Sequence, residues 1–94
     1  MENKKKYSFE TYAVTGGRKG DAGTGAISYP LYLSATFKHE GLNQSTGYDY
    51  TRLQNPTREE VEKTIALLES GREALAFSCG MAALTACVHL FKPG

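Results

Sequence analysis

The clearest hydrophobic pattern lies in the second half of the chain. Val61, Ile65 and Leu68 recur at i, i+4 and i+7, so a helix would carry them on one face. Before this stripe, Thr57 and Glu60 form a Thr-x-x-Glu capping box, in which the hydroxyl and the carboxylate satisfy amides of the first turn. The pattern therefore predicts an amphipathic helix that is capped by Thr57.

The segment after this helix changes character twice. Gly71 is placed to end the helix in the left-handed conformation. Glu73 to Ser78 (EALAFS) is too short for a helix and predicts a short buried strand. After the break at Gly80, Met81 to Phe91 has no polar face, which is typical of a buried helix. Helix, strand and buried helix are the start of an α/β fold.

The first half of the chain lacks such periodicity. Met1 to Gln54 shows no sustained helical period, and glycines recur along it as turn residues. Tyr29 to Phe37 is rich in apolar residues but contains Pro30, so we expect an irregular or edge segment. We therefore expect an irregular arm over 1–54 and the start of a larger α/β domain over 55–94, whose partner strands are absent from the sequence.

Composition narrows the function classes. The 94 residues suit one small domain, and 11 basic against 10 acidic residues leave a net charge of +1. This balance gives no support for binding nucleic acid or a membrane surface. We expect the only charge run, Lys4-Lys5-Lys6, to be a solvated tail, because no apolar stretch of a secretory signal follows it. Cys79 and Cys87 fit two reduced thiols and a cytoplasmic protein.

Two short segments are candidates for binding an anion. Ser78-Cys79-Gly80-Met81 lies at the predicted strand-to-helix turn, where free amides and the helix dipole suit a phosphate. A plain tight turn at Gly80 is the alternative. Tyr48, Tyr50 and Arg52 form the second cluster. In an extended segment Tyr50 and Arg52 would point the same way and could grip one phosphate. Pairing of Arg52 with a carboxylate is the alternative there.

Other sites are disfavoured by the sequence. Lys19 is followed by Gly20 where a P-loop requires Ser or Thr, and no Gly-x-Gly-x-x-Gly occurs. His39 and His89 have no metal ligands at suitable spacing. Cys79 has no His or Asp arrangement that would support a nucleophile.

Taken together, the motifs resemble the start of the Cys/Met-metabolism family of pyridoxal 5'-phosphate (PLP) enzymes. This family includes cystathionine γ-synthases, cystathionine lyases, methionine γ-lyases and O-acetylhomoserine sulfhydrylases. The resemblance is carried by DAGTGAISYPLYLSATF, GYDYTRLQNPTREEVEKTIALLESG and ALAFSCGMAAL. It implies the front of a fold-type I enzyme with a large α/β domain that binds PLP.

The resemblance also implies roles for four residues. The amides of Gly80 and Met81 would bind the cofactor phosphate, and Tyr50 and Arg52 would reach the phosphate of the neighbouring subunit. A homodimer or homotetramer is implied with them. The parent reaction would be γ- or β-elimination or replacement on sulfur-containing amino acids or homoserine esters.

The lysine that carries the Schiff base in family members has no counterpart here. Lys63 and Lys92 do not stand in a matching context, so we expect the 94-residue chain alone to be inactive and to have no catalytic residue of its own. Two alternatives to an enzyme's N-terminal part remain. One is a non-catalytic phosphate-binding or subunit-complementing fragment. The other is a complete small domain unrelated to PLP.

Overall fold

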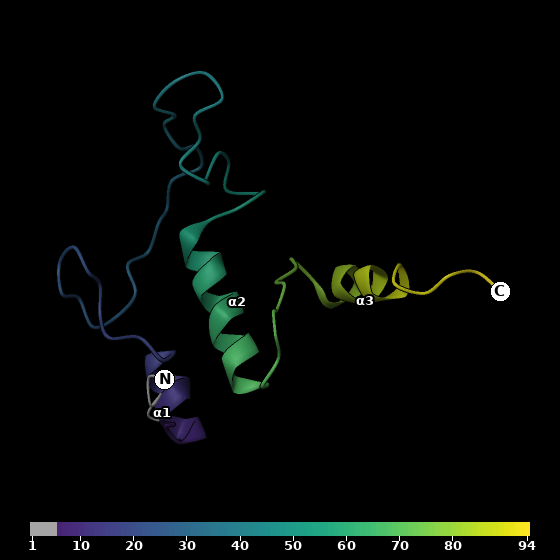
Figure 1. The fold of residues 1–94 in the computed structure, drawn as a ribbon. Helices are drawn as coiled ribbons and strands as arrows, with labels where there is room; N and C mark the ends of the chain where they lie inside the picture. Colours follow the sequence, from purple (N-terminus) through teal and green to yellow (C-terminus); the bar gives the residue numbers. More distant parts are fainter. Residues whose placement is uncertain (1–5) are drawn as a thin grey trace, which may run out of the picture.

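The computed structural model describes residues 6–94, and Lys4 and Lys5 of the basic run lie outside this range. It contains three helices, α1 (Phe9–Thr15), α2 (Pro56–Leu68) and α3 (Gly80–Val88) (Figure 1). The long segment between α1 and α2 is irregular, as predicted. Within residues 6–94 the only strand-like pairings are two isolated bridges, Thr36 with Tyr50 and Gly41 with Gln44.

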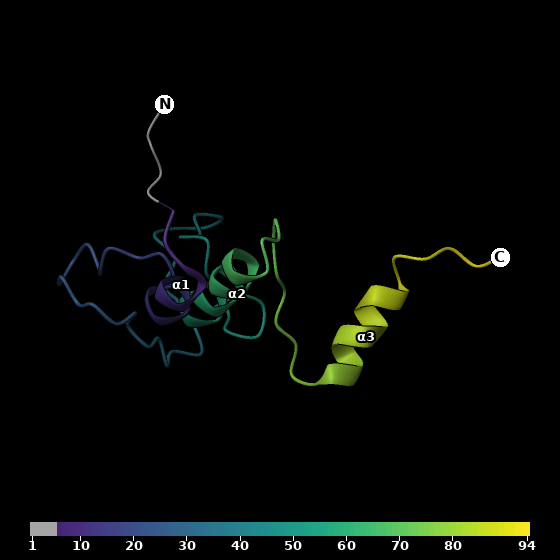
Figure 2. The same cartoon turned by 90° about the horizontal axis from the view of Figure 1, so that it is seen from below.

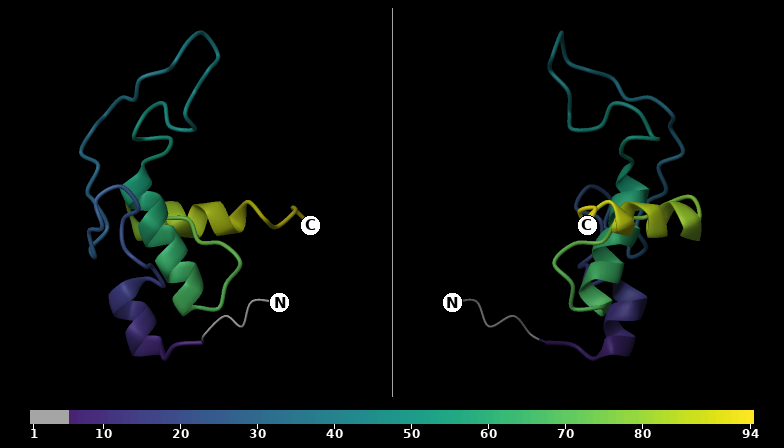
Figure 3. Two further views of the ribbon diagram at one scale, coloured as in Figure 1. Left: turned by 60° about the vertical axis from the view of Figure 1, so that its left-hand side comes forward. Right: turned by 90° about the vertical axis from the view of Figure 1, so that its right-hand side faces the viewer.

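Helix α1 was not expected from the sequence. The Ser8 hydroxyl accepts a hydrogen bond from the Thr11 amide at 3.4 Å, which caps the first turn. Gly16 ends the helix at φ 59°, and its amide donates to the Tyr12 carbonyl at 2.7 Å. With only 7 residues, FETYAVT is too short to show a helical repeat. It packs against α2, and the two lie side by side in Figures 2 and 3.

Helix α2 is present as predicted, but its cap is not the predicted one. The Asn55 side chain accepts from the Thr57 amide at 2.8 Å, and Pro56 takes the first helical position. The Thr57 hydroxyl instead accepts from the Tyr32 amide at 2.8 Å. Glu60 pairs with Arg18 of the arm rather than with the cap. The capping-box prediction is therefore wrong, because both of its side chains hold the arm against the helix.

The end of α2 also differs by one residue from the prediction. Ser70, at φ 52°, adopts the left-handed conformation that was expected of Gly71. The Gly71 amide then donates to the Ala66 carbonyl at 2.8 Å. The helix still ends where the sequence indicates.

The strand predicted at Glu73–Ser78 is not confirmed. No stretch of residues 6–94 forms a strand, and 73–78 has no neighbouring segment that could supply ladder hydrogen bonds. The Ala76 amide instead donates to the Glu62 carboxylate of α2 at 2.9 Å. A strand forms only when a neighbouring segment pairs with it, and residues 6–94 contain no segment that pairs with 73–78.

Helix α3 confirms the predicted position but not the predicted burial. It ends at Val88 rather than Phe91 and projects away from the α1–α2 pair (Figures 1 and 2). Its apolar side chains are exposed, with Met81 at 69% and Leu84 at 59%. The described residues bury little elsewhere, since Ala66 and Asn55 are among the few that are buried. None of the helices described is long and apolar enough to cross a membrane.

Candidate functional site

The loop before α2 brings Tyr50 and Arg52 together. The Leu53 and Gln54 amides both donate to the Tyr50 carbonyl, at 2.9 and 3.0 Å, so the chain turns here and is not extended as predicted. The Arg52 guanidinium carbon nevertheless lies 5.5 Å from the centroid of the Tyr50 ring. This stacking holds the guanidinium and the phenol ring together, whereas the sequence predicted only that the two side chains would point the same way.

The guanidinium of Arg52 is exposed and available. Across residues 6–94 it makes no hydrogen bond and no ion pair, so the alternative of a carboxylate partner is not observed. The Tyr50 hydroxyl is likewise in no hydrogen bond in this part of the chain. The pair thus presents a planar cationic fork and a hydroxyl donor, the groups that suit a phosphate.

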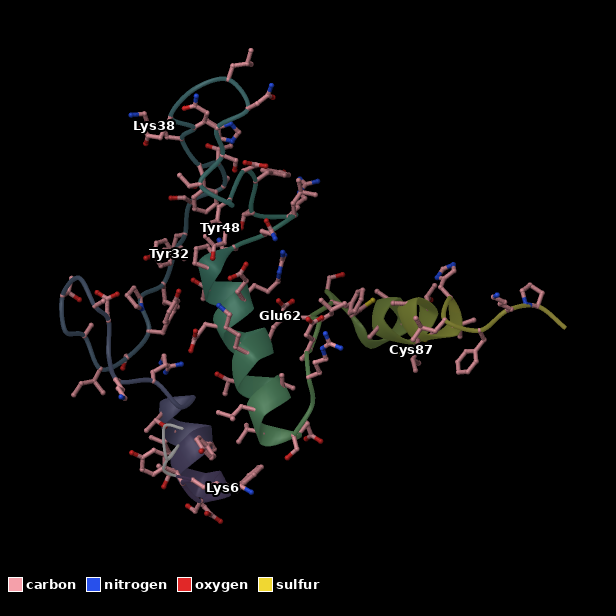
Figure 4. The ribbon with its side chains drawn as sticks, viewed as in Figure 1. Lys6, Tyr32, Lys38, Tyr48, Glu62 and Cys87 are labelled. Carbon is pink, nitrogen blue, oxygen red and sulfur yellow. The ribbon has the colours of Figure 1, made fainter. Side chains whose placement is uncertain are left out.

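Tyr48 does not belong to this pair. Its hydroxyl donates to the Glu59 carboxylate of α2 at 2.8 Å, and its ring lies 5.6 Å from that of Phe37. Figure 4 shows it close to the amino-terminal end of α2. The hydrogen bond to Glu59, followed by burial, raises the pKa of Tyr48 to about 12. The prediction that Tyr48 joins the anion cluster is wrong; its side chain anchors the loop to the helix.

We expect this anchor to titrate at high pH. The folded pKa of Tyr48 lies above the ordinary tyrosine value of about 10, so its stabilising contribution is present below pH 10 and is lost as the pH rises through about 12. The difference in tyrosinate absorbance between the wild type and Tyr48→Phe measures this titration in the full-length protein. A midpoint near the ordinary value would show that the Tyr48–Glu59 bond does not form.

Two further residues fix the loop and were missed by the sequence analysis. Asn55 is 7% exposed, and its Nδ2 donates to the Tyr32 carbonyl at 3.0 Å and to the Thr51 hydroxyl at 2.9 Å. Arg58 donates to three consecutive carbonyls of the turn: those of Thr51 (3.2 Å), Arg52 (3.4 Å) and Leu53. An Asn before Pro is a recognisable cap signal. The role of Arg58 has no local signal, because its partners are backbone atoms.

The N-terminus of α3 is the second candidate anion-binding element, after the Tyr50–Arg52 pair. Cys79 is its cap residue, yet its side chain makes no capping hydrogen bond. Gly80 and Met81 begin the helix, and within 6–94 no side chain accepts from their amides. A Cβ on Gly80 would meet nothing within 4 Å, so the space in front of the turn is open. Unsatisfied amides with the positive end of the helix dipole suit an anion.

The two elements do not converge within one chain. The loop that carries Arg52 lies at the amino-terminal end of α2, while α3 projects to the side of that helix (Figures 1 and 3). In the described chain no hydrogen bond or ion pair links 50–54 to 80–88. In a single copy the two candidate anion-binding elements are therefore separate.

A cavity of about 310 Å³ lies elsewhere, between the arm and α2. None of Tyr50, Arg52, Gly80 and Met81 lines it. Its walls include the apolar face of α2, with Val61 and Ile65, and the Arg18–Glu60 pair. The Arg18 guanidinium also lies 5.8 Å from the Tyr29 ring centroid, so these charged groups serve to fasten the arm.

The irregular arm and the N-terminus of α3 thus each present donor groups of the kind that suit a phosphate. The sequence model of the Cys/Met metabolism PLP-dependent enzyme family matches residues 10–94. The chain belongs to this family, as its motifs indicated. The cofactor of the family is PLP, which agrees with the cofactor predicted from the sequence.

Curated relatives and solved structures agree with this assignment. A cystathionine gamma-synthase/O-acetylhomoserine (thiol)-lyase of Bacillus subtilis is 49% identical over 85 residues, which are 90% of this chain and 23% of the relative. A cystathionine gamma-synthase of Haemophilus influenzae is 46% identical over 86 residues, 92% of this chain and 23% of that protein. The chain thus spans 23% of the length of these relatives.

The structural matches cover the same part. Cystathionine gamma-lyase of Lactobacillus plantarum, solved with L-serine, matches with a TM-score of 0.79 at 43% identity over 94% of this chain and 23% of that chain. The metB structure of Corynebacterium glutamicum gives a TM-score of 0.82 at 39% identity, with the same coverage. The fold is therefore that of the corresponding part of these enzymes, although the predicted strand is not formed here.

Proposed function

We propose that residues 1–94 are the N-terminal part of a PLP-dependent enzyme of methionine and cysteine metabolism. The enzyme is similar to cystathionine γ-synthase and cystathionine lyase and catalyses a γ- or β-elimination or replacement. The identity of 49% to a Bacillus subtilis cystathionine gamma-synthase/O-acetylhomoserine (thiol)-lyase supports this reaction class. Residues 1–54 form its arm and inter-subunit loop, residues 55–94 begin the cofactor-binding domain, and the enzyme is cytoplasmic.

The observation that carries the proposal is the free Arg52 guanidinium stacked on Tyr50. It fits the phosphate group of PLP, as does the uncapped N-terminus of α3. The amides of Gly80 and Met81 hold this phosphate through the helix dipole, and Tyr50 and Arg52 clamp it with side-chain donors. PLP, when bound, supplies an electron sink for the substrate. The role of this chain is to hold the cofactor by its phosphate.

The two halves of the phosphate site come from different subunits in this proposal. Tyr50 and Arg52 reach a neighbouring copy, whose Gly80 and Met81 amides hold the same phosphate. The separation of the two elements within one chain supports this arrangement (Figure 1). A homodimer or a homotetramer would complete each site, and a closed symmetric assembly places every clamp next to a partner's helix.

The experiment uses the full-length enzyme that contains these residues. Loaded with PLP, it is expected to release a thiol from L-cystathionine, or to form cystathionine from O-acetylhomoserine and cysteine. Lys63 is an exposed residue of α2 that pairs with Glu59 at 3.4 Å, and it does not stand in the sequence context of a Schiff-base lysine. The 94 residues alone should therefore show no turnover. If the PLP-loaded full-length protein performs neither reaction, the alternative of a non-catalytic phosphate-binding or subunit-complementing fragment is favoured.

A further inference from the structure

We propose that Arg58 is a positioning residue for the phosphate clamp, which it controls by holding the backbone of the turn that carries Arg52. This inference rests on the proposed function, in which Arg52 binds the cofactor phosphate. Arg58 lies in the first turn of α2 and donates to the carbonyls of Thr51, Arg52 and Leu53, two of them at 3.2 and 3.4 Å. One side chain thus fixes the three peptide units around Arg52.

The position of Arg58 on its helix indicates that it serves the turn. A positive charge in the first turn of a helix is unfavourable to the helix dipole, by about 0.3–1 kcal/mol. The Arg58 side chain is only 34% exposed, so it is not a freely solvated residue. The three carbonyl oxygens of the turn compensate for both costs, because each carries partial negative charge. The planar guanidinium has enough donors to bind all of them at once.

Backbone anchoring matters because the clamp itself is exposed. Within residues 6–94 the Arg52 side chain makes no hydrogen bond or ion pair, and its guanidinium stacks on the Tyr50 ring. Its direction therefore depends on the turn. Besides Arg58, the turn is held by the Leu53 and Gln54 amides on the Tyr50 carbonyl, by the Thr51 amide on the Ala35 carbonyl at 2.9 Å, and by Asn55 on the Thr51 hydroxyl. Without Arg58 the turn would keep these bonds, but the carbonyls of residues 51–53 would lose this partner and the peptide units on either side of Arg52 would be held less firmly.

Arg58 is itself held by the helix. Its Nε lies 3.9 Å from the Glu62 carboxylate, one turn further along α2. The same Glu62 oxygen accepts from the Ala76 amide, in the segment that leads to Gly80. Glu62 lies on the side of α2 that faces this segment (Figure 4). Helix α2 therefore anchors two segments: the turn that carries Arg52, through Arg58, and the segment that leads to α3, through Glu62.

The test compares the affinity of the full-length apoenzyme for PLP and for pyridoxal, which lacks the phosphate. We expect Arg58→Ala to raise the dissociation constant for PLP by about threefold to tenfold and to leave that for pyridoxal unchanged, because a displaced clamp affects only the phosphate. In an Arg52→Ala background, Arg58→Ala should add no further loss. Arg58→Lys provides one ammonium for three carbonyls, so its dissociation constant for PLP should lie between those of the wild type and Arg58→Ala.

The matched control is Arg72→Ala, which removes an exposed arginine that makes no ion pair or hydrogen bond in the described chain. Its PLP affinity should equal that of the wild type. Equal losses for PLP and pyridoxal, or effects of Arg58→Ala and Arg52→Ala that add fully, would overturn the positioning role. Should Arg58→Ala not fold, Arg58→Lys is used for the same two comparisons. These are its loss of affinity for PLP against that for pyridoxal, and the additivity of its effect with that of Arg52→Ala. An Arg52→Ala variant with normal PLP affinity would instead refute the clamp itself, and with it the proposed phosphate site.

Discussion

Replacing Arg52 by alanine in the full-length enzyme is expected to raise the dissociation constant for PLP by about 10- to 100-fold. A hydrogen bond to a charged group contributes about 1.5–3 kcal/mol, and each 1.4 kcal/mol corresponds to a tenfold change in affinity. Arg52 is exposed and has no ion pair within residues 6–94, so its removal should leave the fold intact. Titration of the apoenzyme with PLP, followed by visible absorbance, measures the change.

Two further variants separate shape from charge at this position. Arg52→Lys keeps the positive charge but loses the planar fork and weakens the stacking on Tyr50, so we expect an intermediate affinity. Arg72→Ala removes an arginine of the same charge elsewhere and should leave the affinity unchanged. Wild-type affinity in the Arg52→Ala enzyme would show that the phosphate is held without this side chain.

Replacing Asn55 by alanine is expected to lower the free energy of unfolding by about 2–4 kcal/mol. Loss of an N-cap costs about 1 kcal/mol, and each of the two hydrogen bonds that the Asn55 Nδ2 group donates contributes about 0.5–1.5 kcal/mol. Asn55 is buried at 7% exposure, caps α2 through the Thr57 amide and also holds the Tyr32 carbonyl. The thermal midpoint of the full-length protein and its unfolding in urea measure the loss.

Asn55→Asp separates the two causes of this loss of stability, the N-cap of α2 and the hydrogen bonds that the Asn55 Nδ2 group donates. The aspartate keeps an oxygen that accepts from the Thr57 amide, but it has no amide hydrogens for the Tyr32 carbonyl or the Thr51 hydroxyl. We therefore expect a smaller loss than in Asn55→Ala. A change in Asn55→Ala of less than about 0.5 kcal/mol, the range typical of exposed surface positions, would contradict the anchoring role.

The sequence predicted those parts of the chain whose signals are local. The apolar stripe of α2 and the all-apolar run of α3 were sufficient to place both helices. Helix α1 escaped prediction because 7 residues span only about two turns, which is too short for a repeat. The cap of α2 was assigned to Thr57 instead of Asn55, because the sequence could not show that the Thr57 hydroxyl binds the arm through the Tyr32 amide.

In the candidate site too, the sequence predicted the local features but not the contacts between residues distant in the chain. Tyr50 and Arg52 are close neighbours in the chain, and the sequence grouped them in one cluster, but a turn and not an extended segment brings them together. Tyr48 was grouped with them on proximity alone, but Glu59, 11 residues later, binds its hydroxyl. The hydrogen bonds of Arg58 to three carbonyls depend on the backbone geometry of the turn. No residue pattern indicates that geometry, so the sequence could not reveal these hydrogen bonds.

In the proposed enzyme each phosphate is held by the α3 turn of one subunit and by the clamp, Tyr50 and Arg52, of its neighbour. Co-assembly of two defective full-length variants tests this arrangement. Arg52→Ala removes the clamp, and Gly80→Glu places a carboxylate at the α3 N-terminus, where a Cβ meets open space and φ is not left-handed. Each variant alone is expected to bind PLP poorly.

In a mixed dimer the two defects would meet in one site and leave the other intact. When the subunits assort at random, about a quarter of all sites should then regain wild-type affinity for PLP. If both elements served the phosphate of their own subunit, every site in the mixture would keep one defect. Recovery of PLP binding on co-assembly is the result predicted here, and its absence in verified mixed dimers would contradict the shared site.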